Sequence, residues 1–397
     1  MASEPNRPAR RLRAARREEE RVTPLELFFD LVFVLAITQC TTLMAGEPTW
    51  HGLAKGLLVL GVLWWAWVGY AWLTSVVDPE EGAVRIAMFA AMAAFLVVAL
   101  CVPKAFDDLG LTFAVSYGLV RAAHIALFVL ASRDESAFRR SVIGLGLGSA
   151  IGVSLLIGAS FVHGEVQGGL WVLALLLDAG EPFLFGAEGW KLVPGHFAER
   201  HGLIVIIALG ESIVAIGVGA AAGVTAGVIA AAVLGMALAA AMWWAYFDVV
   251  AYVAARRLSS LPEGRKRNEM ARDSYSYLHF PMVASIVLVA LGMKKTLAHV
   301  DDPLATVPAV ALIGGVALYL LAHVAFRLRN FHTVNKQRLL VALVLMALVP
   351  LGTEVPAIAA LGACAILFCT LIAYEAVRFA EGRNQVRHQL HAEPPSP

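Results

Sequence analysis

Charged residues are scarce in this sequence, and long apolar runs take their place. Asp, Glu, Lys and Arg make up 15% of the 397 residues, whereas 59% are hydrophobic. Soluble domains average about 25% charged residues, so the composition excludes an ordinary soluble domain. A membrane-spanning helix needs about 20 mainly apolar residues, and such windows follow one another from Leu25 to Phe379. The sequence therefore predicts an all-α fold, a polytopic transmembrane helical bundle.

Motifs of soluble chemistry are also absent. The four cysteines lie in apolar segments without CxxC spacing, so we expect reduced thiols and neither a disulfide framework nor a zinc site. The chain lacks a phosphate-binding loop, a dinucleotide fingerprint and the Gly-x-Ser-x-Gly elbow. We therefore expect no cofactor, no metal and no ATP-driven pumping by this chain, and we predict that the protein is not an enzyme.

The apolar runs predict about twelve spans. They cover residues 25–44, 53–77, 84–102, 111–131, 141–162, 169–187, 203–220, 224–247, 275–293, 306–327, 338–352 and 357–378. The eleventh is the shortest. The remaining polar stretches are short, so no large soluble domain is expected between the spans.

Lys and Arg are distributed unevenly between the two sides that these spans define. Of the 31, only Lys55, Lys104, Lys294 and Lys295 lie on one side, and Arg121 lies within a span; all others share the side of the termini. The first 21 residues carry seven Arg and no apolar core of their own, so they do not resemble a cleaved signal peptide. The positive-inside rule then predicts a multi-pass protein of the cell membrane with both termini cytoplasmic.

The two halves of the chain share landmarks in the same order. Asp30 precedes the Trp64-Trp65-Ala66-Trp67 cluster by 34 positions, and Glu211 precedes Trp243-Trp244-Ala245-Tyr246 by 32. Asp107-Asp108 of the first half corresponds to Asp301-Asp302 of the second, and His124 corresponds to His323. We interpret this as two parallel six-helix pseudo-repeats. The expected organisation is a basic arm (1–24), a first membrane repeat (25–190), a second (191–380) and a cytoplasmic tail (381–397).

Small and aromatic residues suggest how the helices pack. Gly144, Gly148 and Gly152 recur at four-residue spacing in the fifth predicted span, which favours a close approach by another helix. The tryptophan clusters at Trp64 and Trp243 lie well inside their spans. We therefore expect both clusters to pack in the core and not to form an interfacial belt.

Ionisable residues inside the apolar spans are the candidate functional residues. A charge at the bilayer centre costs about 2.5 to 3.5 kcal/mol on insertion scales, so each should face a partner or a water-filled cavity. Glu26 and Asp30 are four residues apart and share a helix face, although Glu26 also suits the first turn of its helix. The candidate substrate or ion pathway comprises Glu26, Asp30, Arg121, His124, Glu211 and His323.

Structural explanations stand beside this functional one. Arg121 is always charged, and a closed salt bridge with Asp30 or Glu211 would fix helix register without transport. Asp178 and Glu181, just before Pro182, suggest either a broken helix lining a transport site or a span end that reaches the headgroups. We favour the span end. The segment 196–201 contains two His and a Glu, but their spacing argues against a metal site.

Four segments resemble a known family. They are Val22-Thr23-Pro24-Leu25-Glu26-Leu27-Phe28-Phe29-Asp30-Leu31-Val32-Phe33-Val34, the aromatic run at 64–70, the stretch 196–212 with its Leu-Gly-Glu-Ser, and Tyr275-Ser276-Tyr277-Leu278-His279-Phe280-Pro281-Met282. Together they resemble the bacterial low temperature requirement protein A family over nearly the whole chain. The resemblance implies a bacterial inner-membrane protein linked by name to growth in the cold, and it carries no biochemical activity over.

Two functions are consistent with these observations. The first is a secondary transporter or ion-conducting protein with a midplane acidic, Arg and His site, moving an ion or small molecule that the sequence does not identify. The alternative is a non-transporting membrane protein that supports cold or envelope adaptation through lipids or partner proteins. A membrane enzyme is less consistent, because no nucleophile and base stand at recognisable spacing. The expected partner is the lipid bilayer and not nucleic acid, and the oligomeric state stays open, with a homo-oligomer among the options.

Overall fold

The computed structural model describes residues 21–132, 136–184, 190–381 and 383. The basic arm before Arg21 and the tail beyond Arg383 lie outside these residues, so the predictions made for them are not addressed by the structure. All long elements of the described chain are helices, and the first six of them precede residues 185–189, which are not described.

The described residues form fifteen α-helices, several of them short. They are α1 (Pro24–Gly46), α2 (Trp50–Thr74), α3 (Gly82–Cys101), α4 (Gly110–Ala131), α5 (Ser136–Ala159), α6 (Gly164–Leu184), α7 (Pro194–Gly219), α8 (Ala226–Phe247), α9 (Val250–Ser259), α10 (Arg265–Met270), α11 (His279–Ala298), α12 (Thr306–Ala309), α13 (Gly315–Phe331), α14 (Lys336–Leu348) and α15 (Ala357–Arg378). Segments of π-helix join α10 to α11 (Ala271–Tyr277) and α12 to α13 (Val310–Gly314).

Eleven of the helical stretches are long and apolar enough to cross a membrane. They match eleven of the twelve predicted spans, including the short eleventh, which is Lys336–Thr353. The sixth predicted span corresponds to α6, a 21-residue helix that is not among the eleven and that carries Glu165, Asp178 and Glu181. The predicted helical transmembrane bundle is confirmed.

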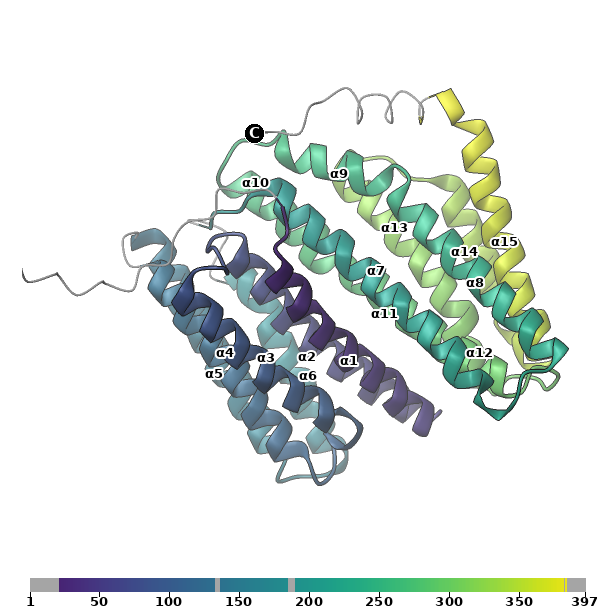
Figure 1. Ribbon diagram of the computed structural model, residues 1–397, viewed down its shortest axis with the longest axis horizontal. Helices are drawn as coiled ribbons and strands as arrows, with labels where there is room; N and C mark the ends of the chain where they lie inside the picture. Colours follow the sequence, from purple (N-terminus) through teal and green to yellow (C-terminus); the bar gives the residue numbers. More distant parts are fainter. Residues whose placement is uncertain (1–20, 133–135, 185–189, 382, 384–397) are drawn as a thin grey trace, which may run out of the picture.

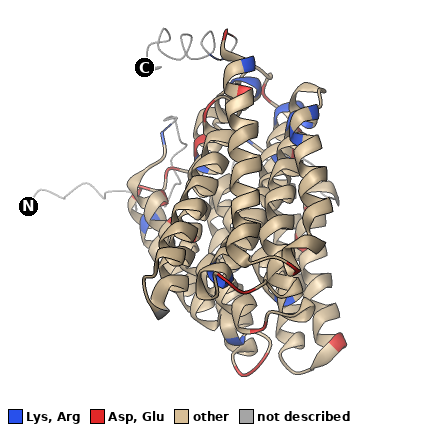
Figure 2. Ribbon diagram, turned by 90° about the vertical axis from the view of Figure 1, so that its right-hand side faces the viewer, with Lys and Arg blue, Asp and Glu red and all other residues tan. Residues whose placement is uncertain are grey.

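Helices α1 and α7 lie side by side between two groups of helices (Figure 1). Helices α2 to α6 form one group, and α8 to α15 the other, with α11 packed along α7. Charged residues gather mostly toward the two ends of the bundle (Figure 2). The internal repeat predicted from sequence stays a prediction.

A capping box fixes the start of α1. The Thr23 hydroxyl accepts from the Glu26 amide at 3.4 Å, and the Thr23 amide donates to Glu26 Oε2 at 2.9 Å. Pro24 at the first helical position has no amide hydrogen that would need a partner. This sequence-encoded cap holds the Glu26 side chain at the entrance of the helix, where it takes part in the site described below.

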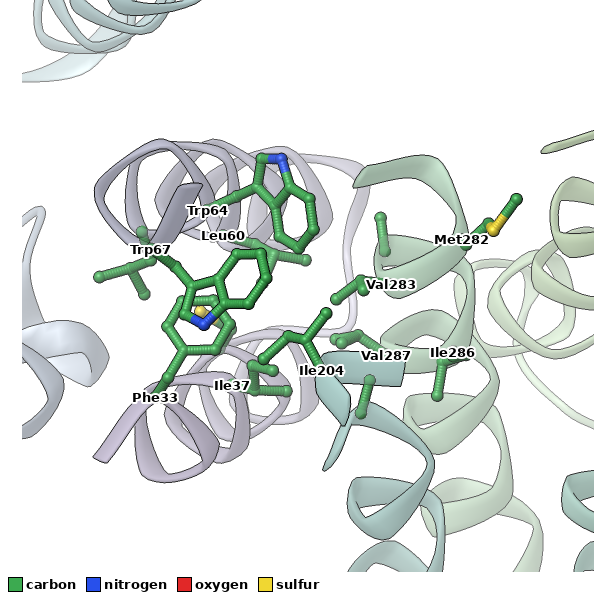
Figure 3. Packing of buried hydrophobic residues seen from close by; sticks show 14 of the residues in the cluster. Phe33, Ile37, Leu60, Trp64, Trp67, Ile204, Met282, Val283, Ile286 and Val287 are labelled. Atoms are coloured by element: carbon green, nitrogen blue, oxygen red, sulfur yellow. The ribbon is translucent and has the colours of Figure 1, made fainter. Parts of the chain in front are cut away.

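The two tryptophan clusters differ in their surroundings. Trp64 and Trp67 are fully buried and stack on each other, with ring centroids 5.1 Å apart. They pack with residues of α1, α7 and α11 in the centre of the bundle (Figure 3). Core packing is therefore confirmed for this cluster. It was wrong for the second one, because Trp243 and Trp244 are 44% and 41% exposed.

Helix α5 packs against α6 through the glycine-bearing face that the four-residue spacing indicated. A Cβ at Gly148 would lie 3.4 Å from Glu181 Cγ, and one at Gly152 would lie 3.6 Å from Asp178 Oδ1, so an alanine at either position would make an ordinary van der Waals contact. The small face of α5 thus lies directly against the acidic residues of α6. This contact brings α6 into the bundle despite its polar composition.

Candidate functional site

Ion pairs join α1 to α7 where the two halves of the bundle meet. Glu26 Oε1 accepts from Arg200 Nη1 at 3.0 Å, and His196 Nε2 lies 2.8 Å from the same oxygen. Asp30 Oδ1 accepts from Arg200 Nη2 at 2.7 Å. All four side chains are fully buried. We call Glu26, Asp30, His196 and Arg200 the seam network.

Helix α2 supports the seam network from a third side. Trp67 Nε1 donates to Asp30 Oδ1 at 2.8 Å, Thr74 Oγ1 accepts from Arg200 at 3.2 Å, and Ser75 Oγ lies 3.0 Å from His196 Nδ1. Asp30 Oδ2, in contrast, has no hydrogen-bond partner among the described residues. The Arg200 guanidinium thus bridges two carboxylates in a site from which solvent is excluded.

Glu211 lies farther along α7 and has different surroundings. Its Oε2 accepts from Thr38 Oγ1 of α1 at 2.5 Å, and the residue is 2% exposed. Eleven residues separate it from Arg200, which corresponds to about 16 Å along a helix. Phe33, Ile37 and Ile204 occupy the intervening positions of α1 and α7 and are buried (Figure 3). An apolar layer therefore separates Glu211 from the seam network.

A second charged cluster lies inside the first group of helices. Arg121 Nη2 donates to Asp178 Oδ1 at 3.3 Å, and its Nε donates to Ser149 Oγ at 3.1 Å. His124 and Glu181 line the same small cavity, whose volume is about 80 Å³. The interpretation of Asp178 and Glu181 as a span end among headgroups was wrong, because both are buried, at 7% and 8% exposure.

A third cluster lies inside the second group of helices. Arg338 Nε and Nη2 donate to the two carboxylate oxygens of Glu375 at 3.0 and 2.8 Å. Arg338 Nη1 donates to His323 Nδ1 at 2.9 Å, so this ring nitrogen is the acceptor. The cluster lines a cavity of about 480 Å³, together with Asp248 and Arg383, which form an ion pair.

The structure divides the six predicted site residues among four places. Glu26 and Asp30 share the seam network, Arg121 and His124 the second cluster, and Glu211 and His323 lie apart from both and from each other. Arg121 pairs with Asp178 and with neither of the two acids considered as its partners. Their shared role in one pathway stays a prediction.

Sequence reasoning missed Arg200 as a site residue. The segment 196–201 was considered only as a metal site, which its spacing argued against, whereas the structure buries His196 and Arg200 beside Glu26 and Asp30. Their spacing was an available signal: His196 and Arg200 are four residues apart, as are Glu26 and Asp30, so each pair projects from one helix face. Among the described residues, no group of three His, Cys, Asp or Glu side chains is arranged to hold a metal ion.

A small polar cluster lies at the opposite end of α1, where Glu47 stands between two spans and His51 and Lys55 belong to the first turns of α2. Glu47 accepts from Lys55 Nζ at 3.4 Å and lies 3.1 Å from His51 Nδ1. The hydrogen bond to His51 lowers the pKa of the Glu47 carboxyl. This carboxylate is partly exposed, so it provides a surface comparison for the buried acids of the bundle.

The fold and its buried ion pairs define a polytopic helical membrane protein. Residues 21–373 match the family described as bacterial low temperature requirement A protein, LtrA. The chain belongs to this family. It is also similar to an uncharacterized protein of Rhizobium meliloti (strain 1021), with 30% identity over 324 residues that cover 78% of each chain. No solved structure gives a significant match.

Proposed function

We propose that the protein is a secondary transporter or ion-conducting protein of the cell membrane, with its pathway along the contact between α1 and α7. One observation carries the proposal: the seam network places two carboxylates, a guanidinium and an imidazole, all fully buried, between helices of the two halves. Ionisable groups at membrane depth are costly and in membrane proteins commonly mark ion or substrate paths.

The seam network lies toward one end of the contact between α1 and α7, because its residues belong to the first two turns of each helix. In transporters built from two halves, one half rocks against the other around a site near the middle of the membrane, and access from each side opens and closes in turn. Ion pairs at the contact between α1 and α7 would break and form again during such a motion. The pair Arg121–Asp178 lies within the first half, and Arg338–Glu375 lies within the second. Each pair would therefore hold its own half rigid while the halves move.

Purified protein in liposomes tests this proposal. Ions and small metabolites are screened by thermal shift, and those that stabilise the protein are then followed in flux measurements. We expect Asp30→Asn to abolish flux while leaving the protein folded, because the variant loses the charge that Arg200 balances. Glu47→Gln, a change in an exposed acid outside the spans, should transport at the unaltered rate. Unchanged flux in Asp30→Asn would exclude the seam as the pathway.

The alternative is a membrane protein that does not transport and supports cold or envelope adaptation through lipids or partner proteins. The bidentate bridge of Arg200 to Glu26 and Asp30 favours it, because a closed and fully buried network can serve helix register alone. In that case Asp30→Asn would lower the melting temperature of the protein without altering any flux, and the folded variant would still restore growth in the cold to a strain lacking the gene.

A further inference from the structure

Glu211 differs from the buried acids that pair with arginine. Asp30, Asp178 and Glu375 each accept hydrogen bonds from an arginine. Glu211 forms no ion pair in the described part of the chain, and a hydroxyl, that of Thr38, is its closest donor at 2.5 Å. Glu26 and Asp30, the other acids described on the contact between α1 and α7, both accept hydrogen bonds from Arg200. Glu211 lies on the same contact without a cation at hydrogen-bond distance among the described residues.

The groups around Glu211 come from two helices besides α7. Helix α1 contributes Thr38, Thr41 and the thiol of Cys40, and helix α11 contributes Lys294. The Lys294 side chain is half-buried near the end of α11 and is not ion-paired with Glu211 in the described residues. The Thr41 hydroxyl donates to the Ile37 carbonyl at 3.3 Å. The immediate partners of the carboxyl group are therefore neutral hydroxyls.

Charge and geometry together select the ligand for this site. A carboxylate that is buried without a paired cation is strongly disfavoured, and taking up a proton removes its charge. A hydroxyl such as Thr38 both donates and accepts, so it can serve the ionised and the protonated acid in one place. Hard metal cations need about six oxygen ligands or more, and one carboxyl group with two hydroxyls supplies too few.

We propose that Glu211 is a proton-binding site that is reached from the Lys294 end of the bundle. The buried layer of Phe33, Ile37 and Ile204 closes the way from Glu211 to the seam network. The proton on Glu211 is therefore exchanged on one side of the layer, and Arg200 with its two acids lies on the other. The inference that Glu211 binds a proton is independent of the proposed function. A role of this proton as the coupling ion of transport rests on the proposed function.

Carbodiimide labelling tests the proposal without any transport measurement. Dicyclohexylcarbodiimide enters membranes and reacts with a protonated carboxylic acid: the O–H adds across one C=N bond, and the adduct rearranges to a stable N-acylurea. Mass spectrometry of the digested full-length protein locates the added mass. We expect label on the peptide containing Glu211 at low pH, a loss of label as pH rises, and none in Glu211→Gln. Glu375, which is held by Arg338, is the internal comparison and should stay unlabelled.

The outcomes separate the possibilities. No label on Glu211 at any pH, in protein whose circular dichroism and melting temperature are normal, overturns the proposal. Label that is suppressed by sodium at constant low pH also overturns it, because the site then prefers a metal cation. Normal pH-dependent labelling in protein that shows no flux in liposomes keeps the proton site and rejects the transport function, so the two failures are distinguishable.

Discussion

Each arginine buried among the helices is held by a carboxylate from a different helix. Arg121 of α4 pairs with Asp178 of α6, Arg200 of α7 with two acids of α1, and Arg338 of α14 with Glu375 of α15. Since a guanidinium keeps its charge at all accessible pH values, removing one partner leaves the other as an uncompensated buried charge. A substitution that removes one member of a pair should therefore lower the free energy of unfolding by more than the intact pair contributes to it.

The Arg121–Asp178 pair offers a direct test at this scale. We expect Asp178→Leu to destabilise the protein by about 3 to 5 kcal/mol, because it leaves the Arg121 charge buried and unpaired. The double variant Arg121→Met with Asp178→Leu should recover most of this loss, since neither charge remains. Thermal unfolding in a mild detergent measures both. A double variant no more stable than Asp178→Leu would show that the pair contributes packing and not charge balance.

The sequence predicted which residues carry charge inside the membrane more successfully than it predicted their partners. Glu26, Asp30, Arg121 and Glu211 are all buried, as expected of charges within apolar spans. The identity of each partner depends on which helices are neighbours, and apolar helices carry little information about that. Arg121 therefore appeared as a candidate partner of Asp30, although the acid that α6 brings beside it is Asp178.

At the scale of whole helices, apolar runs were sufficient to locate the spans but not to orient them. Helix α8 is apolar on every face, so no periodicity indicates which side lies inward. This explains why Trp243 and Trp244 were expected in the core and are exposed instead. Helix α6 shows the opposite case: its acids lower its hydropathy, yet it packs against α5 and its Asp178 pairs with Arg121 of α4.

The contact of α11 with the π-helical segment Val310–Gly314 depends on one glycine. A Cβ at Gly292 would lie 2.5 Å from Leu312 Cβ and 2.9 Å from the Leu312 backbone nitrogen, and backbone cannot move aside easily. We expect Gly292→Ala to destabilise the protein by about 1 to 3 kcal/mol, as overpacked cores do. Gly217→Ala is the matched control, because nothing lies within 4 Å of its Cβ. Equal melting temperatures for the two variants would contradict the close contact.

At the scale of the whole molecule, the seam network joins the first helices of the two halves. Helices α1 and α7 begin the two halves, and both begin on the same side, where the seam network lies. The 6 + 6 repeat would explain this relation, because corresponding helices would then share one orientation. It was inferred from the order of landmarks alone, and Glu211, one of those landmarks, lies in the structure near Thr38 of α1 and not at the level of Asp30.

The orientation predicted from the Lys and Arg distribution is testable by cysteine accessibility. Ser259 at the end of α9 lies on the side predicted to be cytoplasmic, Asp301 after α11 lies on the other, and both are exposed. The native cysteines are buried or half-buried, so they should react little. In intact cells we expect a membrane-impermeant maleimide to label Asp301→Cys and to leave Ser259→Cys unlabelled.

Permeabilised cells supply the control for this measurement. Both variants should be labelled there, because both positions are exposed to solvent once the reagent can enter. The reverse pattern in intact cells, with Ser259→Cys labelled and Asp301→Cys protected, would invert the bundle in the membrane. Glu211 would then exchange its proton with the cytoplasm, and the seam network would lie toward the outside. The same two variants thus fix the direction in which any proton gradient would act on Glu211.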